Sequence, residues 1–202
     1  MVFGSSWWCV AGGDWRPDPK RTLGLLQSRT SDRERWGTRA SYDSAWRGRS
    51  ELAASLLQGP VTLLDLGAGE MHLETLLPAG SVYIPADLEP LDERCLRVDL
   101  NTDSVPRGPY QVVSLLGVAE YLFDLPRILG EVRSESESLL LSYCCVTDRS
   151  PEVLAARRRT GWANAYTDDE LIGLARELGW RLTRSSDYNE HRGFVQRVFL
   201  FS

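Results

Sequence analysis

The stretch Val61-Thr-Leu-Leu-Asp65-Leu-Gly67-Ala-Gly69-Glu70 runs from an apolar segment directly into a Gly-x-Gly turn. Residues 61–66 predict a short buried strand, and residues 71–77 predict a helix that Pro78 ends. Glycine at positions 67 and 69 allows a tight turn and a close approach of the backbone to a ligand, because no Cβ stands in the way. The stretch therefore predicts a strand–loop–helix unit with a ligand-binding loop.

Apolar runs on the C-terminal side of this unit continue the alternation of strands and helices. The pattern predicts strands at 81–86, 95–98, 110–116 and 138–144, and helices at 125–132 and 168–178. Two extended segments, 180–187 and 193–201, finish the chain and are joined by a polar turn at 188–192. This order is typical of an open, mostly parallel α/β sheet, whose ligand crevice lies beyond the carboxyl ends of the strands.

The N-terminal segment has a different pattern, which divides the chain into an arm or lid (1–41) and one domain (42–202). Residues 1–35 contain several glycines and prolines and show no apolar periodicity, so we expect irregular structure. From Tyr42 to Leu57 apolar side chains recur at three- and four-residue steps, with Arg49 among them. That spacing predicts an amphipathic helix leading towards the glycine loop.

Composition excludes several classes of protein. The 202 residues are 43% hydrophobic and 25% charged, as in one soluble globular domain, and no apolar run is long enough to span a membrane. The net charge of −5 disfavours a general nucleic-acid binder. Only two histidines and four cysteines without metal-ligand spacing are present, so we expect no metal site.

Two further features concern the setting of the protein. The cysteines predict buried free thiols in a reducing compartment, which favours the cytoplasm. All basic residues except Lys20 are arginines, which is typical of a high-GC, bacterial genome.

Three consecutive predicted strands end in aspartate, namely Asp65, Asp87 and Asp99. Asp65 would repel a pyrophosphate, and His72 stands where the dinucleotide-binding fingerprint needs its third glycine, so a nicotinamide-dependent oxidoreductase is disfavoured. A cationic cofactor such as S-adenosylmethionine, by contrast, suits an acidic loop. Asp87 follows Gly69 by 18 residues, close to the spacing at which a carboxylate meets ribose hydroxyls. Asp99 is suited to accept a hydrogen bond from an adenine amino group.

With these residues the sequence resembles the Rossmann-like (class I) S-adenosylmethionine-dependent methyltransferases. Leu64-Asp65-Leu-Gly-Ala-Gly69 is similar to their first motif, and Val112-Val-Ser-Leu-Leu-Gly117-Val-Ala-Glu120-Tyr121-Leu to their fourth-strand motif. The resemblance implies a mostly parallel seven-stranded sheet with an antiparallel C-terminal hairpin strand, and helices on both faces. It also implies S-adenosylmethionine as cofactor, with these binding residues: Asp65, Gly67, Gly69, Asp87, Leu88, Asp99, Leu100, Gly117 and, near the methionine carboxylate, Tyr42.

The methyl acceptor is less well defined by the sequence. Glu120, Tyr121 and His191 follow predicted strands and are candidates for catalytic acid–base roles. Arginine beside aromatic side chains favours a small acceptor, which gives four candidate substrate-binding residues: Arg158, Trp162, Asn164 and Tyr143. The resulting hypothesis is O- or N-methylation of a specialised metabolite or glycan-type acceptor, without nucleic-acid or membrane partners. A protein methyltransferase and a non-catalytic binding or scaffold protein of the same fold are the alternatives.

Overall fold

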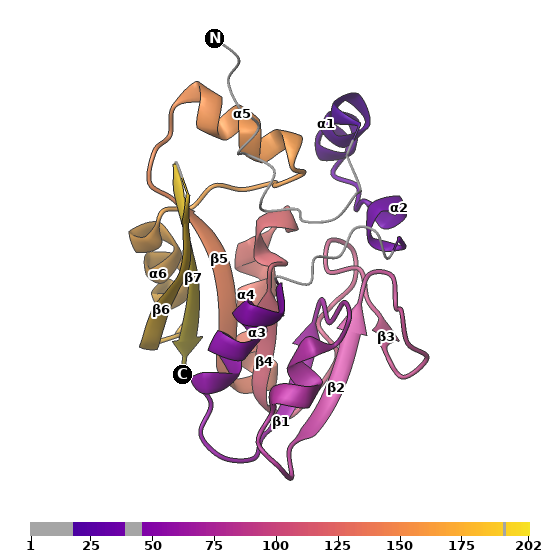
Figure 1. Cartoon of the computed structure of the whole chain (residues 1–202), viewed down its shortest axis with the longest axis vertical. Helices are drawn as coiled ribbons and strands as arrows, with labels where there is room; N and C mark the ends of the chain where they lie inside the picture. The colour runs from indigo at the N-terminus through magenta and orange to yellow at the C-terminus, as the bar shows by residue number, and fades with distance from the viewer. Residues whose placement is uncertain (1–17, 39–45, 192) are drawn as a thin grey trace.

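The computed structural model describes residues 18–38, 46–191 and 193–202. Its centre is one sheet with the strand order β3-β2-β1-β4-β5-β7-β6 (Figure 1). Its seven strands are β1 (Thr62–Leu66), β2 (Val82–Asp87), β3 (Leu96–Arg97), β4 (Tyr110–Leu116), β5 (Ser136–Val146), β6 (Leu182–His191) and β7 (Phe194–Phe201). Strands β1 to β5 pair in parallel, whereas β7 is antiparallel to both of its neighbours. The predicted mostly parallel α/β sheet with an antiparallel C-terminal strand is confirmed.

Helices cover both faces of the sheet. Helices α4 (Leu125–Glu135) and α6 (Asp168–Glu177) bury their apolar sides on one face. Helix α3 (Trp46–Ser55) and the short 3₁₀ helix η3 (His72–Leu76) pack against the other face. The central strands are therefore enclosed on both sides, which explains why β4 and β5 read as nearly continuous apolar runs.

The N-terminal segment is more regular than its sequence predicts. Within the described part, α1 (Pro19–Ser28) and the one-turn α2 (Arg33–Trp36) replace the expected irregular chain. The carboxylate of Asp18 caps α1 by accepting from the backbone N–H of Lys20 at 3.0 Å, and proline occupies the first helical position. Only Thr22 of α1 is buried, so the helix needs no apolar stripe, and periodicity alone does not reveal it.

Helix α1 packs against α5 (Pro151–Arg159), and both lie at the same end of the molecule in Figure 1. The longest helix among the described residues is α4, with 11 residues. None of the helices in the described ranges has the length and apolar character needed to cross a membrane.

Two other elements differ from the sequence prediction. The helix expected after the glycine loop is reduced to η3, because the chain from Gly69 to Pro78 leaves room for little more than one turn. The prediction of a polar turn at 188–192 is wrong for residues 188–191, since β6 continues to His191. As the edge strand of the sheet, β6 tolerates polar side chains that a central strand would exclude.

The central position of β5 leads to a stability prediction. Leu140 is 0% exposed and lies in the cluster under α3, so Leu140→Ala should lower the free energy of unfolding by about 2–5 kcal/mol in urea denaturation. Leu96 in β3 is 45% exposed, and Leu96→Ala is the matched control, which we expect to change stability by less than about 1 kcal/mol. Equal losses in both variants would contradict this account of the core.

Candidate functional site

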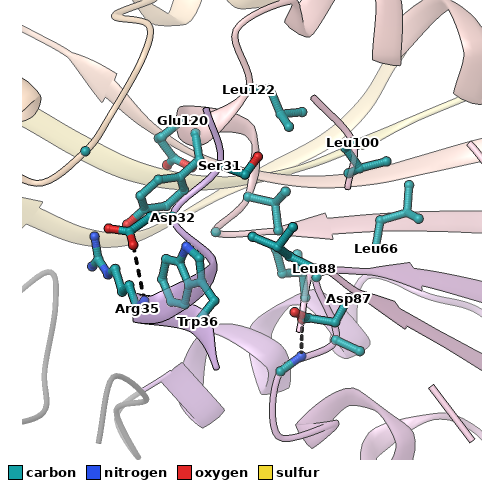
Figure 2. A pocket seen from close by; sticks show the side chains of 18 of the residues that line it. Ser31, Asp32, Arg35, Trp36, Leu66, Asp87, Leu88, Leu100, Glu120 and Leu122 are labelled. Atoms are coloured by element: carbon teal, nitrogen blue, oxygen red, sulfur yellow. Dashed lines mark hydrogen bonds between the residues drawn. The ribbon is translucent and has the colours of Figure 1, made fainter. Parts of the chain in front are cut away.

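A cavity lies at the carboxyl ends of β1, β2 and β4, and we call it the central cavity (Figure 2). The N-terminal segment α1–α2, α3 and the segments that follow these strands form its walls. Eleven of the residues predicted to act in the site line this cavity: Asp65, Gly67, Gly69, Asp87, Leu88, Asp99, Leu100, Gly117, Glu120, Tyr121 and Trp162. The structure thus brings together three predicted strand ends and the fourth-strand motif.

The glycine loop is held against the end of β2 by its backbone. The N–H groups of Gly67 and Ala68 both donate to the carbonyl of Ala86, at 2.7 and 3.1 Å. Gly67 has φ +84°, and a Cβ at this position would lie 2.1 Å from a methyl group of Val118. Glycine is required here by the neighbouring Val118 and by the backbone conformation, in addition to any ligand.

Asp87, at the end of β2, joins the loop to the predicted ribose site. Its carboxylate accepts from the backbone N–H of Gly69 at 2.9 Å and from that of Glu89 at 3.1 Å. Burial raises the pKa of Asp87, whereas these backbone hydrogen bonds lower it. A carboxylate has about four acceptor sites, so Asp87 retains capacity for two ligand hydroxyl groups.

Asp65, at the end of β1, is buried within the sheet. The hydroxyl of Ser114 donates to one of its oxygens at 2.6 Å, and that of Tyr83 donates to the other at 2.7 Å. Burial raises the pKa of Asp65, which the two hydroxyl donors partly offset. Asp65 therefore shapes the electrostatics beneath the glycine loop while its own oxygens are satisfied by neighbouring strands.

Asp99, the third strand-end aspartate, contacts the N-terminal segment. The Ser31 hydroxyl donates to it at 2.7 Å, and the guanidinium of Arg33 forms a 3.2 Å ion pair with it. Arg33 also pairs with Glu89 at 2.8 Å. These contacts place α1–α2 across the edge of the cavity beside Asp99, and no motif in the sequence indicates them.

Arg49 is the most informative residue that the sequence analysis did not assign to the site. It extends from α3 into the wall of the cavity, and a Cβ on Gly117 would lie 2.4 Å from one of its guanidinium nitrogens. Its Nε atom is buried and has no hydrogen-bond partner among the described residues. Burial lowers the pKa of Arg49, while nearby Glu120 opposes that shift. The available signal was an arginine on the apolar side of the predicted helix.

Glu120 and Tyr121 belong to the 3₁₀ helix η4 (Ala119–Tyr121) beyond β4. Glu120 is 1% exposed, and the backbone N–H of Cys144 donates to one of its oxygens at 2.8 Å. The ring of Tyr121 meets that of Trp36 edge-on, with 5.3 Å between centroids. Burial raises the pKa of Tyr121, so its hydroxyl is disfavoured as an anion near neutral pH.

The predicted substrate-binding residues separate in the structure. Trp162 is 4% exposed and lines the cavity, whereas Arg158 is exposed on α5 and is not among the lining residues. Tyr143 and Asn164 do not line it either. The Tyr143 hydroxyl donates to the side chain of Asn164, whose amide donates to the carbonyls of Ala119 and Leu122, at 2.8 and 3.0 Å. These two residues support η4 from behind.

Two of the predicted site residues cannot be placed. Tyr42, expected near a methionine carboxylate, lies outside the described residues. His191 ends β6, but its side chain is also outside what the structure describes.

The charges around the central cavity are predominantly negative. Among its described lining residues are two arginines, Arg35 and Arg49, and these six carboxylates: Asp32, Asp65, Glu70, Asp87, Asp99 and Glu120. No group of three or more potential metal ligands occurs in the described ranges. The lining favours a ligand of net positive charge and disfavours a pyrophosphate.

The buried hydroxyl of Tyr143 leads to a second prediction. This hydroxyl donates to the side chain of Asn164. It also accepts from the backbone N–H of Tyr166 at 2.9 Å and from the Arg157 guanidinium at 3.3 Å. Tyr143→Phe leaves these buried groups without their partner, so the free energy of unfolding should fall by about 1–3 kcal/mol in urea denaturation. Tyr110→Phe, which removes one hydroxyl bonded to the carbonyl of Arg107, is the control. A direct role in substrate binding instead predicts unchanged stability.

The chain matches no protein-family model and no curated protein, but its fold is similar to solved structures. A 1,6-didemethyltoxoflavin N1-methyltransferase from Burkholderia thailandensis, with bound S-adenosylhomocysteine, has a TM-score of 0.61 and 16% identity, over 94% of this chain and 92% of that one. A Leishmania major S-adenosylmethionine-dependent methyltransferase has a TM-score of 0.61 and 16% identity, over 96% and 89%.

A third similar structure is that of an enzyme with a different reaction. The [4+2]-cyclase SpnF has a TM-score of 0.58 and 10% identity, over 77% of this chain and 79% of that one. The fold alone therefore does not determine the chemistry. Together with the strand order and the antiparallel β7, these likenesses show that the chain has the fold of the class I S-adenosylmethionine-dependent methyltransferases.

Proposed function

We propose that this protein is an S-adenosylmethionine-dependent methyltransferase that acts on a small molecule, through O- or N-methylation. The observation that carries the proposal is the set of strand ends in one cavity. The glycine loop, Asp87 and Asp99 follow β1, β2 and β3 in order, and all of them line the central cavity. When bound there, S-adenosylmethionine supplies a methyl group activated by its attachment to a sulfonium.

The nucleoside part of the cofactor fits the cavity beside β2 and β3. Asp87 would accept the ribose hydroxyls, and its contact with Gly69 holds the loop in place for this. Leu88 and Leu100 offer apolar surface to an adenine ring, and Figure 2 shows Leu88 beside Asp87. Asp99 would accept from the adenine amino group while the N-terminal segment covers it through Ser31.

The methionine part fits the region between α3 and Gly117. A carboxylate is the natural partner for a buried guanidinium with an unpaired nitrogen, so we assign the cofactor carboxylate to Arg49. The carboxylate of Asp65 beneath the loop contributes a negative field that favours the sulfonium and the ammonium group. The role we predicted for Tyr42 at this carboxylate remains untested.

A small acceptor is supported by the enclosure of the cavity. The N-terminal segment, α3 and the aromatic side chains of Trp36 and Trp162 surround the space beyond Gly117. These walls restrict the orientation of an acceptor, which contributes to catalysis of a displacement reaction. We also propose that residues 1–41 form the arm that covers the cavity, and that the free Cys95, Cys144 and Cys145 reflect a reducing, cytoplasmic setting.

Calorimetric titration with S-adenosylhomocysteine, S-adenosylmethionine and NAD tests the proposal. Both adenosyl ligands should bind and NAD should not. Binding of NAD alone would identify an oxidoreductase. Binding of the adenosyl ligands, without any labelled methyl transfer to a metabolite extract, would support a non-catalytic protein or a different reaction.

Asp87 provides the first mutational prediction of this function. Asp87→Asn retains the size of the side chain but loses charge-assisted hydrogen bonds to the ribose, which are worth about 1.5–3 kcal/mol. The dissociation constant for S-adenosylhomocysteine should therefore rise about 10- to 150-fold in calorimetry. Asp169, exposed in the first turn of α6, gives the control Asp169→Asn, which should bind like the wild type.

Arg49 provides a prediction that depends on the part of the ligand it contacts. Arg49→Gln should raise the dissociation constant for S-adenosylhomocysteine by about 10-fold or more, because a charge-assisted contact to the carboxylate of this ligand is lost. 5′-Methylthioadenosine, which lacks the amino-acid end, should bind the variant and the wild type equally. An equal loss for both ligands would assign Arg49 to the structure of the cavity instead.

A further inference from the structure

Glu120 is a buried carboxylate, and one of its oxygens lacks a partner among the described residues. It is 1% exposed, and it lines the central cavity directly beyond β4. Its Oε1 atom accepts the backbone N–H of Cys144 at 2.8 Å, whereas its buried Oε2 accepts no hydrogen bond from the part of the chain that the structure describes. A buried carboxylate oxygen without a donor is costly, so this geometry indicates a ligand group that donates.

Arg49 does not satisfy this oxygen. The two side chains attract each other, and Glu120 accordingly favours the charged form of Arg49, but they form no salt bridge in the described structure. Each of them has an unpartnered buried atom, the Nε of Arg49 and the Oε2 of Glu120. With Arg49 assigned to the cofactor carboxylate, Glu120 is left to face the acceptor.

Aromatic side chains surround the space next to Glu120. Trp36, Trp46, Tyr121 and Trp162 all line the cavity. The rings of Trp36 and Tyr121 meet edge-on at 5.3 Å, and that of Trp46 lies 6.2 Å from Trp36. Figure 2 shows Trp36 and Glu120 on the same side of the pocket, away from Leu66 and Leu100. Such rings pack against planar ligands. An arginine guanidinium lies over one face of each ring: Arg35 over Trp36 and Tyr121, Arg49 over Trp46, and Arg157 over Trp162.

We propose that this region binds the methyl acceptor, and that the acceptor is a planar aromatic nitrogen base whose N–H group donates to Oε2 of Glu120. The inference rests on the proposed methyltransferase function and narrows it from O- or N-methylation to N-methylation. It assigns to Glu120 the recognition of the acceptor and the acceptance of its proton.

The electrostatics of the transfer favour nitrogen over hydroxyl oxygen as the atom that accepts the methyl group. The nitrogen lone pair forms the new N–C bond while the C–S bond breaks and its electron pair stays on sulfur, so positive charge moves from sulfur to nitrogen. The N–H proton passes to Oε2 of Glu120 and from there to water. A carboxylate beside the nitrogen stabilises the charge as it develops. A hydroxyl acceptor reacts readily only after it has lost its proton, and the oxyanion formed in that way would lie beside Glu120, where the carboxylate disfavours it.

The charge of the whole cavity also favours a nitrogen base over an anionic acceptor. Its described lining holds six carboxylates and two guanidiniums, and Arg49 is assigned to the cofactor. Asp32 and Asp99 are paired with Arg21 and Arg33, at 2.7 and 3.2 Å, so the negative charge comes from the other four carboxylates. An anionic acceptor would meet a negative field on entering, whereas a neutral or cationic base would be attracted. The buried carboxylate therefore selects for a base that donates a hydrogen bond, and the aromatic walls select for a planar molecule.

Three planar probes of similar size test the inference on the full-length protein saturated with S-adenosylhomocysteine. They are 4-aminoquinoline, a cationic nitrogen base; 1-naphthol, a neutral hydroxyl compound; and 1-naphthoate, an anion. Calorimetric titration near neutral pH should show 4-aminoquinoline binding about 10-fold more tightly than 1-naphthol, with 1-naphthoate weakest. Failure to bind 4-aminoquinoline, or a preference for either of the other probes, would overturn the inference.

The variant Glu120→Gln isolates the carboxylate. Glutamine retains an oxygen for the N–H of Cys144, so the variant should keep the folded structure, which circular dichroism checks. The affinity for 4-aminoquinoline should fall about 10-fold, while that for 1-naphthol changes by less than about 3-fold. Glu152→Gln, on the exposed side of α5, removes the same charge outside the cavity and should leave all three affinities unchanged.

The affinity for S-adenosylhomocysteine separates this inference from the proposed function. It should be the same in Glu120→Gln and the wild type. A loss in the variant would assign Glu120 to the ammonium group of the cofactor and overturn the inference while leaving the function in place. If the wild type does not bind S-adenosylhomocysteine, the proposed function is refuted. The three probes would then be titrated into the protein without S-adenosylhomocysteine, and the same order of affinities would still be expected if Glu120 binds a nitrogen base.

Discussion

The structure of the candidate site depends on the contact between the glycine loop and the end of β2. The carbonyl of Ala86 accepts from the backbone N–H groups of Gly67 and Ala68, and the N–H of the next residue, Gly69, donates to the Asp87 carboxylate. The same carboxylate therefore fixes the loop and faces the cavity. Because β1 and β2 are parallel neighbours, their carboxyl ends meet at one edge, and this contact is possible only there.

The remaining parts of the site are arranged around this edge by elements that are distant in sequence. Helix α3 contributes Arg49, η4 contributes Glu120, and the N-terminal segment reaches Asp99 through Ser31. The loop at 162–166 holds η4 in place through Asn164, whose amide donates to the carbonyl of Ala119 in η4 and to that of Leu122, which follows it. One cavity thus combines a positive and a negative buried group, both of them lacking a hydrogen-bond partner on one atom among the described residues.

The sequence was sufficient to predict the sheet and the strand-end residues, because both depend on local patterns. Apolar runs mark the strands, and Asp87 and Asp99 directly follow the runs at 81–86 and 95–98. The helix α1 was missed because it buries only Thr22, and the role of Arg49 because it depends on a contact with Gly117, 68 positions away. Tyr143 and Asn164 were predicted to bind substrate, but they support η4 through a buried hydrogen bond that sequence spacing does not reveal.

The close contact between Gly117 and Arg49 has a consequence for the divergence of related sequences. Gly117 has φ +76°, and the space that its missing side chain leaves is filled by the guanidinium of Arg49. A larger residue at 117 would displace this group, and a shorter residue at 49 would leave a void beside the glycine. Arginine at 49 therefore requires glycine at 117, whereas the backbone conformation favours glycine at 117 whatever residue stands at 49, so position 49 should vary more freely among homologues than position 117.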